Sequence, residues 1–175
     1  MRKKVINKKL PIILLILVAA YYTLPWMAIN LVVMFGPKPP IPEIKYGEFP
    51  FRLVYEIDGE QKIVEDVIVC EYDGIGMNEG SGKYIKWKSY LKSNRKEEIV
   101  LLSLGIGKKI IYPAGNPRYY MGDLGENRAY NPLFPNAIMT RLNGAGLIDS
   151  NELQEMYNIK LISLEESPPI ENTFK

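Results

Sequence analysis

The sequence contains no histidine and only one cysteine, Cys70. The absence of histidine excludes Ser-His-Asp and Cys-His catalysis and the usual zinc sites. A single cysteine cannot form an internal disulfide, so the folded part must be held together by its hydrophobic core. We therefore predict no catalytic residue, no metal ligand and no cofactor. The enzymatic chemistries that stay open are paired carboxylates, as in glycosidases, and Ser-Lys or Tyr-based sites.

Charged side chains are absent from 26 consecutive residues, Leu10 to Phe35. A helix needs about 20 apolar residues to cross a bilayer core, so this run predicts a transmembrane anchor at residues 10–35. Pro25 lies inside it and predicts a kink that a membrane helix tolerates. Five basic residues and no acidic one precede the run, namely Arg2, Lys3, Lys4, Lys8 and Lys9. By the positive-inside rule, residues 1–9 are a cytoplasmic basic segment and everything after the anchor is extracytoplasmic, so the chain crosses the cell membrane once.

The alternative is a signal peptide that is removed after export. Residues 10–20 have the length of its apolar region, and Val18-Ala19-Ala20 is a passable cleavage site. Cleavage there would leave the apolar stretch 21–35 on the mature protein, so we favour the uncleaved anchor.

Four prolines follow within residues 36–47. This composition favours an extended linker that can lift a domain about 30 Å at most, at about 3.1 Å per residue. Removing the five basic residues that precede the anchor leaves 17 basic against 20 acidic residues, a net charge of −3. A domain of that charge is not a general nucleic-acid binder.

Alternating apolar residues predict a mainly β domain over residues 48–164. Phe49 to Ile57 alternates, Asp58-Gly59 is a hairpin signal, and Gln61 to Tyr72 supplies the return strand. Because Val67 to Cys70 is apolar on both faces, this strand is central in its sheet. Cys70 is accordingly interpreted as a small buried hydrophobe and not as a reactive thiol.

Further strands are predicted at residues 84–91, 99–104, 109–112, 136–142 and 159–164. One helix begins after Asp149, where Glu152 completes a capping box. About seven strands with one or two short helices predict an antiparallel, β-sandwich-like domain. Residues 165–175 are polar and predict a flexible tail.

Four glycines lie within nine residues, Gly74 to Gly82, directly before a lysine. A P-loop requires a glycine and a Ser or Thr where this sequence has Met77 and Tyr84. The residues that follow alternate like a strand, so no helix amino terminus is available to hold a phosphate. The stretch predicts a long hairpin loop whose glycines adopt positive φ angles.

Basic residues gather after these glycines. Residues 83–109 hold eight basic and two acidic side chains, a net charge of +6. One face of the predicted strand carries Tyr84, Lys86, Lys88 and Tyr90. An exposed cationic and aromatic face suits an anionic wall polymer or lipid head groups. The alternative is a solvated strand edge whose lysines discourage aggregation.

Residues 113–136 lack strand periodicity and are rich in proline, glycine and aromatic residues. Loops of this length in a compact domain usually have a function or close as an Ω-loop. One hypothesis is a recognition loop with contacts from Arg118, Tyr119, Tyr120 and Arg128. The other is that the aromatic residues plug the end of the core. Asn116-Pro117 predicts one helical turn, ended by Gly122.

Three stretches carry a resemblance to known sequences: KPPIPEIKYGEFPFRLVYEIDGE, VCEYDGIGMNEGSGKYIKWKSYL and YYMGDL. They resemble a group of uncharacterised single-pass or secreted proteins of Firmicutes bacteria, over most of Lys38 to Pro135. The resemblance carries no known activity, so no functional residue is taken from it.

The prediction from sequence is a membrane-anchored, extracytoplasmic binding or interaction module of the bacterial envelope. Its candidate partners are the membrane itself through residues 10–35, an anionic wall polymer and a membrane protein. The alternative is a carboxylate-dependent enzyme that acts on cell-wall or surface glycan. Two carboxyl groups about 5 to 10 Å apart in a groove would favour that alternative.

Overall fold

The computed structural model describes residues 10–78, 82–125 and 132–175. Its elements, in chain order, are α1 (Leu10–Phe35), β1 (Tyr46–Ile57), β2 (Glu60–Asn78), β3 (Gly82–Leu91), β4 (Glu98–Ser103), β5 (Lys109–Pro113), α2 (Pro117–Tyr120), β6 (Ala137–Arg141), β7 (Gly144–Ile148), α3 (Ser150–Tyr157) and β8 (Ile159–Glu166). Two compact units divide the chain: residues up to 39 with 75–85, and residues 40–74 with 86–175. The predicted basic segment 1–9 and the predicted contact Arg128 lie outside the described residues.

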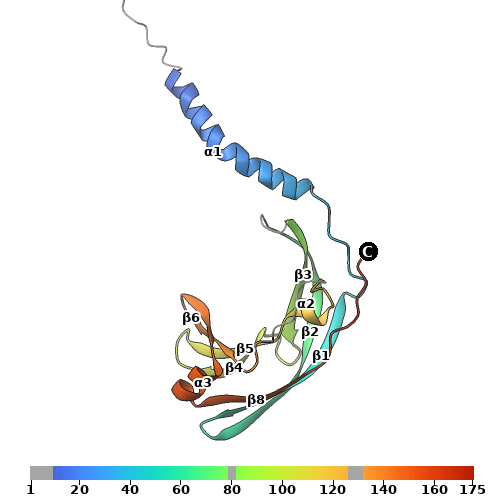
Figure 1. The fold of residues 1–175 in the computed structure, drawn as a ribbon, viewed down its shortest axis with the longest axis vertical. Coiled ribbons are helices and arrows are strands. Elements are labelled where there is room, and N and C mark those ends of the chain that lie inside the picture. Colours follow the sequence, from blue (N-terminus) through green and yellow to red (C-terminus); the bar gives the residue numbers. More distant parts are fainter. Residues whose placement is uncertain (1–9, 79–81, 126–131) are drawn as a thin grey trace, which may run out of the picture. The chain divides into compact units, whose positions relative to one another are not determined.

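Helix α1 is a continuous apolar helix of 26 residues. Its stretch Pro11–Val32 is long and apolar enough to cross a membrane, and it is not buried by the described protein. The helix continues through Pro25, and Figure 1 shows that it bends part-way along its length. The side chains of Thr23 and Asn30 donate hydrogen bonds of 2.9 Å to the carbonyl groups four residues earlier. Such pairing satisfies polar groups within the helix itself, as a lipid environment requires.

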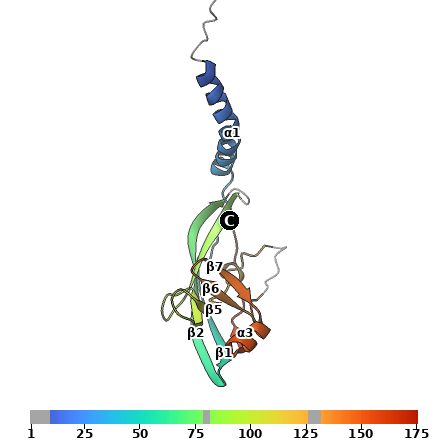
Figure 2. The same ribbon diagram turned by 90° about the vertical axis from the view of Figure 1, so that its left-hand side faces the viewer.

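The strands form two four-stranded antiparallel sheets, in the orders β3-β2-β1-β8 and β4-β5-β6-β7. Strand β1 pairs with β2 along its whole length and with β8 on its other side, and Figure 1 shows β1 and β8 running side by side. Figure 2 shows β5, β6 and β7 next to one another, with α3 close to β7. The prediction of a mainly β, antiparallel fold with few helices is confirmed.

A single hydrophobic cluster receives side chains from both sheets. The alternating residues of β1 point into it as predicted, among them Phe49 and Leu53, and Met139 contributes from the second sheet. Cys70 is fully buried in this cluster, and burial raises the pKa of its thiol to about 12. The interpretation of Cys70 as a small buried hydrophobe is therefore confirmed.

Strand β7 is the element that the sequence patterns do not predict, and it brings the number of described strands to eight. It pairs with β6 over five residue pairs, from Ala137↔Ile148 to Arg141↔Gly144. Helix α3 follows directly and begins as predicted, because the Asp149 side chain accepts hydrogen bonds from the N–H groups of Asn151 and Glu152.

The glycine-rich stretch is not one long loop, and the prediction was wrong about its length. Strand β2 continues through Gly74 and Gly76 to Asn78, and β3 begins at Gly82. Gly74 and Gly82 have the predicted positive φ angles, 88° and 68°. The ring of Tyr84 packs against Gly76. A Cβ at position 76 would lie 2.5 Å from that side chain, so a larger residue would not fit there. These glycines therefore lie within the strands of a long hairpin, because a single residue with a positive φ angle does not have to end a strand.

The carboxyl-terminal segment differs from the predicted flexible tail. The backbone N–H of Lys175 donates to the carbonyl of Ile41 at 3.0 Å, and that of Glu43 donates to Thr173 at 2.9 Å. The side chain of Asn172 bonds both the N–H and the carbonyl of Ile44, at 3.0 and 2.9 Å. These bonds hold residues 41–44 against the tail. Each of those residues except proline has a backbone N–H that needs a hydrogen-bond partner, and the tail supplies it. The part of the predicted linker that these bonds leave out is residues 36–40, where the carbonyl of Gly36 accepts a hydrogen bond of 2.8 Å from Nζ of Lys83.

Candidate functional site

Strand β3 carries the predicted cationic face, but only part of that face is exposed. Lys86 and Lys88 are exposed, and Tyr84, in the first unit, is 39% exposed. Tyr90 is buried, with 8% of its surface exposed, so its predicted place on the open face was wrong. Its hydroxyl donates to Oε1 of Glu71 at 2.7 Å, and the Nζ of Lys88 and the Cζ of Arg95 lie 5.9 and 5.5 Å from its ring centre. Tyr90 is therefore covered by charged side chains, which strand alternation alone does not reveal.

Acidic side chains of the same sheet pair with one lysine of this face, Lys86, and with Lys92 directly after β3. The Nζ atom of Lys86 lies 2.5 Å from Oδ2 of Asp73, and that of Lys92 lies 2.6 Å from Oε2 of Glu48. The hydrogen bond from Lys86 lowers the pKa of Asp73. The hydrogen bond from Lys92, and then that from Tyr46, lowers the pKa of Glu48. This alternation of charge favours the interpretation of β3 as a solvated edge guarded by lysines.

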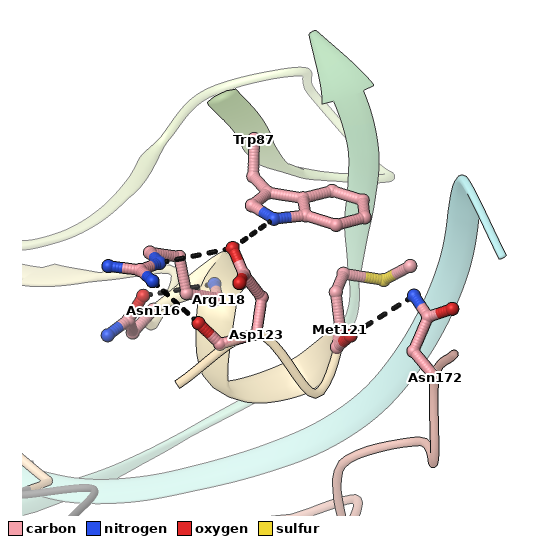
Figure 3. A network of polar contacts seen from close by, with 6 residues as sticks. All are labelled: Trp87, Asn116, Arg118, Met121, Asp123 and Asn172. Carbon is pink, nitrogen blue, oxygen red and sulfur yellow. Dashed lines mark hydrogen bonds and ion pairs between the residues drawn. The ribbon is translucent and has the colours of Figure 1, made fainter. Parts of the chain in front are cut away.

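The segment around α2 is held by a polar network (Figure 3). Oδ2 of Asp123 accepts hydrogen bonds from Nε1 of Trp87 at 2.9 Å and from Nε of Arg118 at 3.2 Å. Nη2 of Arg118 also donates to the backbone carbonyl of Asp123 at 2.7 Å. The side chain of Asn116 accepts from the N–H of Arg118 and caps α2, so the predicted helical turn is present. On the other side, Nδ2 of Asn172 donates to the carbonyl of Met121 at 3.2 Å.

These contacts show what the predicted recognition residues do. Tyr120 is completely buried, its ring centre lies 4.8 Å from that of Phe49, and its hydroxyl donates to Glu166 at 2.8 Å. Tyr120 is thus a core residue, and the prediction that it contacts a ligand was wrong. Tyr119 packs edge-on against it at 5.2 Å, and Arg118 is bound to Asp123 within its own loop. The network of Figure 3 positions the loop, and the aromatic residues close the end of the core.

A shallow groove of about 560 Å³ lies on the first sheet and contains several carboxylates. Nε of Arg52 is 3.0 Å from Glu65, and its Nη1 is 3.6 Å from Glu165. The enzyme alternative requires two carboxylates in one groove, but these two are 69% and 68% exposed and share one guanidinium. A glycosidase acid is held in apolar surroundings instead. The groove has the features of a surface ion-pair network.

A second hollow, of about 590 Å³, lies between β7, the end of β6 and α3. Glycines at positions 144 and 146 put no side chain into it, whereas Leu147 and Met156 are 65% and 66% exposed beside it. The sequence patterns missed this site because β7 was not predicted. The signal that was present is the short Gly-Ala-Gly segment between two apolar runs.

Within the described residues, no group of three or more His, Cys, Asp or Glu side chains is placed to hold a metal ion. Comparisons with protein-family models, with curated proteins and with solved structures found no match to this chain. The functional argument therefore rests on the geometry and the sequence alone.

Proposed function

We propose that this chain is a single-pass membrane protein that presents its β domain as a binding or interaction module of the bacterial envelope. The observation that carries the proposal is helix α1, which has no charged residue and whose stretch Pro11–Val32 is not buried. A core helix of a water-soluble protein is covered by the elements that pack against it. An uncovered apolar helix of this length is stable when lipid surrounds it.

The orientation follows from the basic residues before the helix. By the positive-inside rule, the cluster within residues 2–9 keeps the amino terminus in the cytoplasm and sends the β domain outside. The resemblance of residues 38–135 to single-pass or secreted proteins of Firmicutes supports the same placement, and we include membership of that group in the proposal.

The short linker limits where a partner can be. The tail holds Ile41, and five residues (36–40) lie between the end of the helix and that position, with the carbonyl of Gly36 bonded to Nζ of Lys83 at 2.8 Å. An extended chain of that length covers about 16 Å at about 3.1 Å per residue. The proposed partner is accordingly close to the membrane. Because Lys86 of β3 and Lys92 directly after it already pair with acidic side chains, a membrane protein fits this surface better than an anionic wall polymer.

Topology is the test of the proposal. Protease added to intact protoplasts of cells that express the full chain with a carboxyl-terminal tag should remove the tag and leave a cytoplasmic marker intact. The mass of the membrane-bound chain should show that residues 1–20 are retained. Protection of the tag would contradict the orientation, and a mature amino terminus at Tyr21 would contradict the anchor. Crosslinking in intact cells, followed by pull-down, then identifies the partner.

The carboxylate groove provides the test of the enzyme alternative. We expect the purified full chain to release no reducing sugar from wall glycan. Release that Glu65→Gln or Glu165→Gln abolishes, while the nearby Glu60→Gln leaves it unchanged, would establish the enzyme and contradict the module.

A further inference from the structure

Strand β7 has an open edge within the described part of the chain. It ends the sheet order β4-β5-β6-β7, so β6 pairs with one of its edges and no described strand with the other. An open edge offers a row of backbone N–H and C=O groups to any added strand, and proteins usually blunt such edges with lysine, proline or a bulge. The sequence of β7, Gly-Ala-Gly-Leu-Ile, contains no lysine and no proline, and its pairing with β6 has no register shift.

The surface around β7 is open and partly apolar. The hollow of about 590 Å³ lies between β7, the end of β6 and α3, and a Cβ built on Gly146 would meet no atom within 4 Å. Leu147 and Met156, which line this hollow, expose 65% and 66% of their surfaces. Strand addition gains affinity from backbone hydrogen bonds and from apolar surface next to the edge, and both are present here.

The two ends of β7 carry opposite charges. Arg141, the last residue of β6, stands opposite Gly144 at the start of β7. Asp149 follows the end of β7, and Glu152, one turn into α3, lines the same hollow as Arg141. In the described residues, neither Arg141 nor Glu152 forms an ion pair. The guanidinium of Arg141 lies instead 3.2 Å from the thioether sulfur of Met139.

We propose that the strand added at β7 is the β7 of a second copy of this chain, in antiparallel orientation. Antiparallel addition reverses the strand, so the start of each β7 lies beside the end of the other. Each Arg141, on β6, then stands level with the acidic end of the partner's β7, across Gly144, which has no side chain in between. The arrangement occurs twice because the pair is symmetric. A parallel partner would bring like charges together. Pairing about the middle residue, Gly146, joins two four-stranded sheets into one, and the symmetry stops the assembly at two copies.

This inference goes beyond the proposed function, since it assigns a surface and a partner that the topology does not require. Its failure would leave the result of the protease experiment unchanged. Both charged residues are exposed, and Glu152 also lies in the first turn of α3, so a thermal unfolding curve of each variant checks that the fold is kept.

Charge reversal tests the identity of the partner. Two differently tagged full-length chains are co-expressed, extracted in detergent and co-purified. Wild-type chains should co-purify, whereas Arg141→Glu paired with itself, or Glu152→Arg paired with itself, should lose at least about 90% of the co-purified chain. The mixed pair, one copy with each substitution, restores opposite charges at both contacts and should recover association. Undiminished self-association of the single variants, or no recovery in the mixed pair, would overturn the proposal.

Cysteine crosslinking tests the position of the contact. Oxidation of membranes that contain the full-length Gly146→Cys variant should give a species of twice the 20.0-kDa chain mass. The matched control is Ser103→Cys at the end of β4, the opposite edge of the same sheet, and wild-type Cys70 is buried and serves as the blank. Equal crosslinking of Gly146→Cys and Ser103→Cys would indicate association through the anchor and overturn the β7 contact. A Gly146→Cys adduct of another mass would mean that a different protein occupies the edge, which also overturns it.

Discussion

Strands β3 and β7 both lie at the edge of a sheet, but the side chains on and around the two strands differ. Lys86 of β3 and Lys92 directly after it pair with acidic residues of β2 and β1. Tyr90 is buried beneath charged side chains, and Trp87 binds the α2 loop. Along β7, two glycines and an alanine precede Leu147, and the surface beside them is apolar.

The difference indicates which edge is closed and which is available. A charged, well-packed edge discourages the addition of another strand, because the added strand would have to displace ion pairs and desolvate lysines. A glycine-rich edge with apolar surroundings has no such barrier. The packing therefore stabilises β3 within its own chain, and β7 is the edge at which we propose association. The following experiments are arranged from the largest expected effect to the smallest.

The largest effect is expected from truncating Tyr90 on β3. Tyr90→Ala removes a buried ring and the hydrogen bond to Glu71, and should lower the free energy of unfolding by about 3 kcal/mol. Leu147→Ala on β7 removes a side chain that is 65% exposed and should change it by less than about 0.5 kcal/mol. Thermal and denaturant unfolding of both full-length variants, at a concentration where the chains are separate, measures the difference. Equal losses would mean that the two edges are packed alike.

Trp87→Phe should have an intermediate effect. It keeps an aromatic ring but removes the donor to Asp123, a carboxylate with 17% of its side chain exposed. The expected loss is about 1 kcal/mol, because Arg118 still binds this carboxylate. A double-mutant cycle with Asp123→Ala isolates the bond. If the free-energy losses of the two single variants simply add up to the loss of the double variant, the network of Figure 3 does not hold the loop to β3.

Reversing the lysines of β3 should affect stability slightly. The combination of Lys86→Glu, Lys88→Glu and Lys92→Glu breaks two exposed ion pairs, which solvent screens strongly. Since Lys86 and Lys92 are paired with acidic side chains and Lys88 lies over the ring of Tyr90, retention of the protein on anionic vesicles or teichoic acid should not change. A salt-dependent loss of retention would instead support the interpretation of this face as a polymer-binding surface. Lys160→Glu on β8 is the matched control at another exposed position.

The smallest effect should be seen on acidification. The pKa values of Glu48 and Asp73 in the folded protein are lowered from 4.5 and 3.8, chiefly by hydrogen bonds from Lys92 and Lys86. Groups with lowered pKa values contribute stability above their ordinary values, and that stability is lost as the pH falls through the folded values. The melting temperature of the wild type should thus decrease more steeply below about pH 4.5 than that of a Lys86→Gln and Lys92→Gln variant. Parallel curves would show that these pairs contribute nothing measurable.

Several features followed from the sequence because they depend on neighbouring residues. The alternation of Phe49 to Ile57 predicts β1, the turn Asp58-Gly59 predicts the hairpin, and Asp149 predicts the start of α3. The uncharged run from Leu10 to Phe35 predicts helix α1 with the same bounds. In each case the periodicity, the turn or the cap is a property of a short stretch, and local physics is sufficient.

Other features were decided by residues far away in the chain. Strand β7 has little intrinsic preference for a strand and is held by its pairing with β6. Tyr90 alternates like an exposed residue but is buried by Glu71, Lys88 and Arg95. The tail from Ser167 onwards has a polar composition, yet it is fixed because the backbone near Ile41 needs hydrogen-bond partners. Composition describes what a segment prefers alone, whereas the pairing of backbone groups depends on which distant segment folding brings beside it.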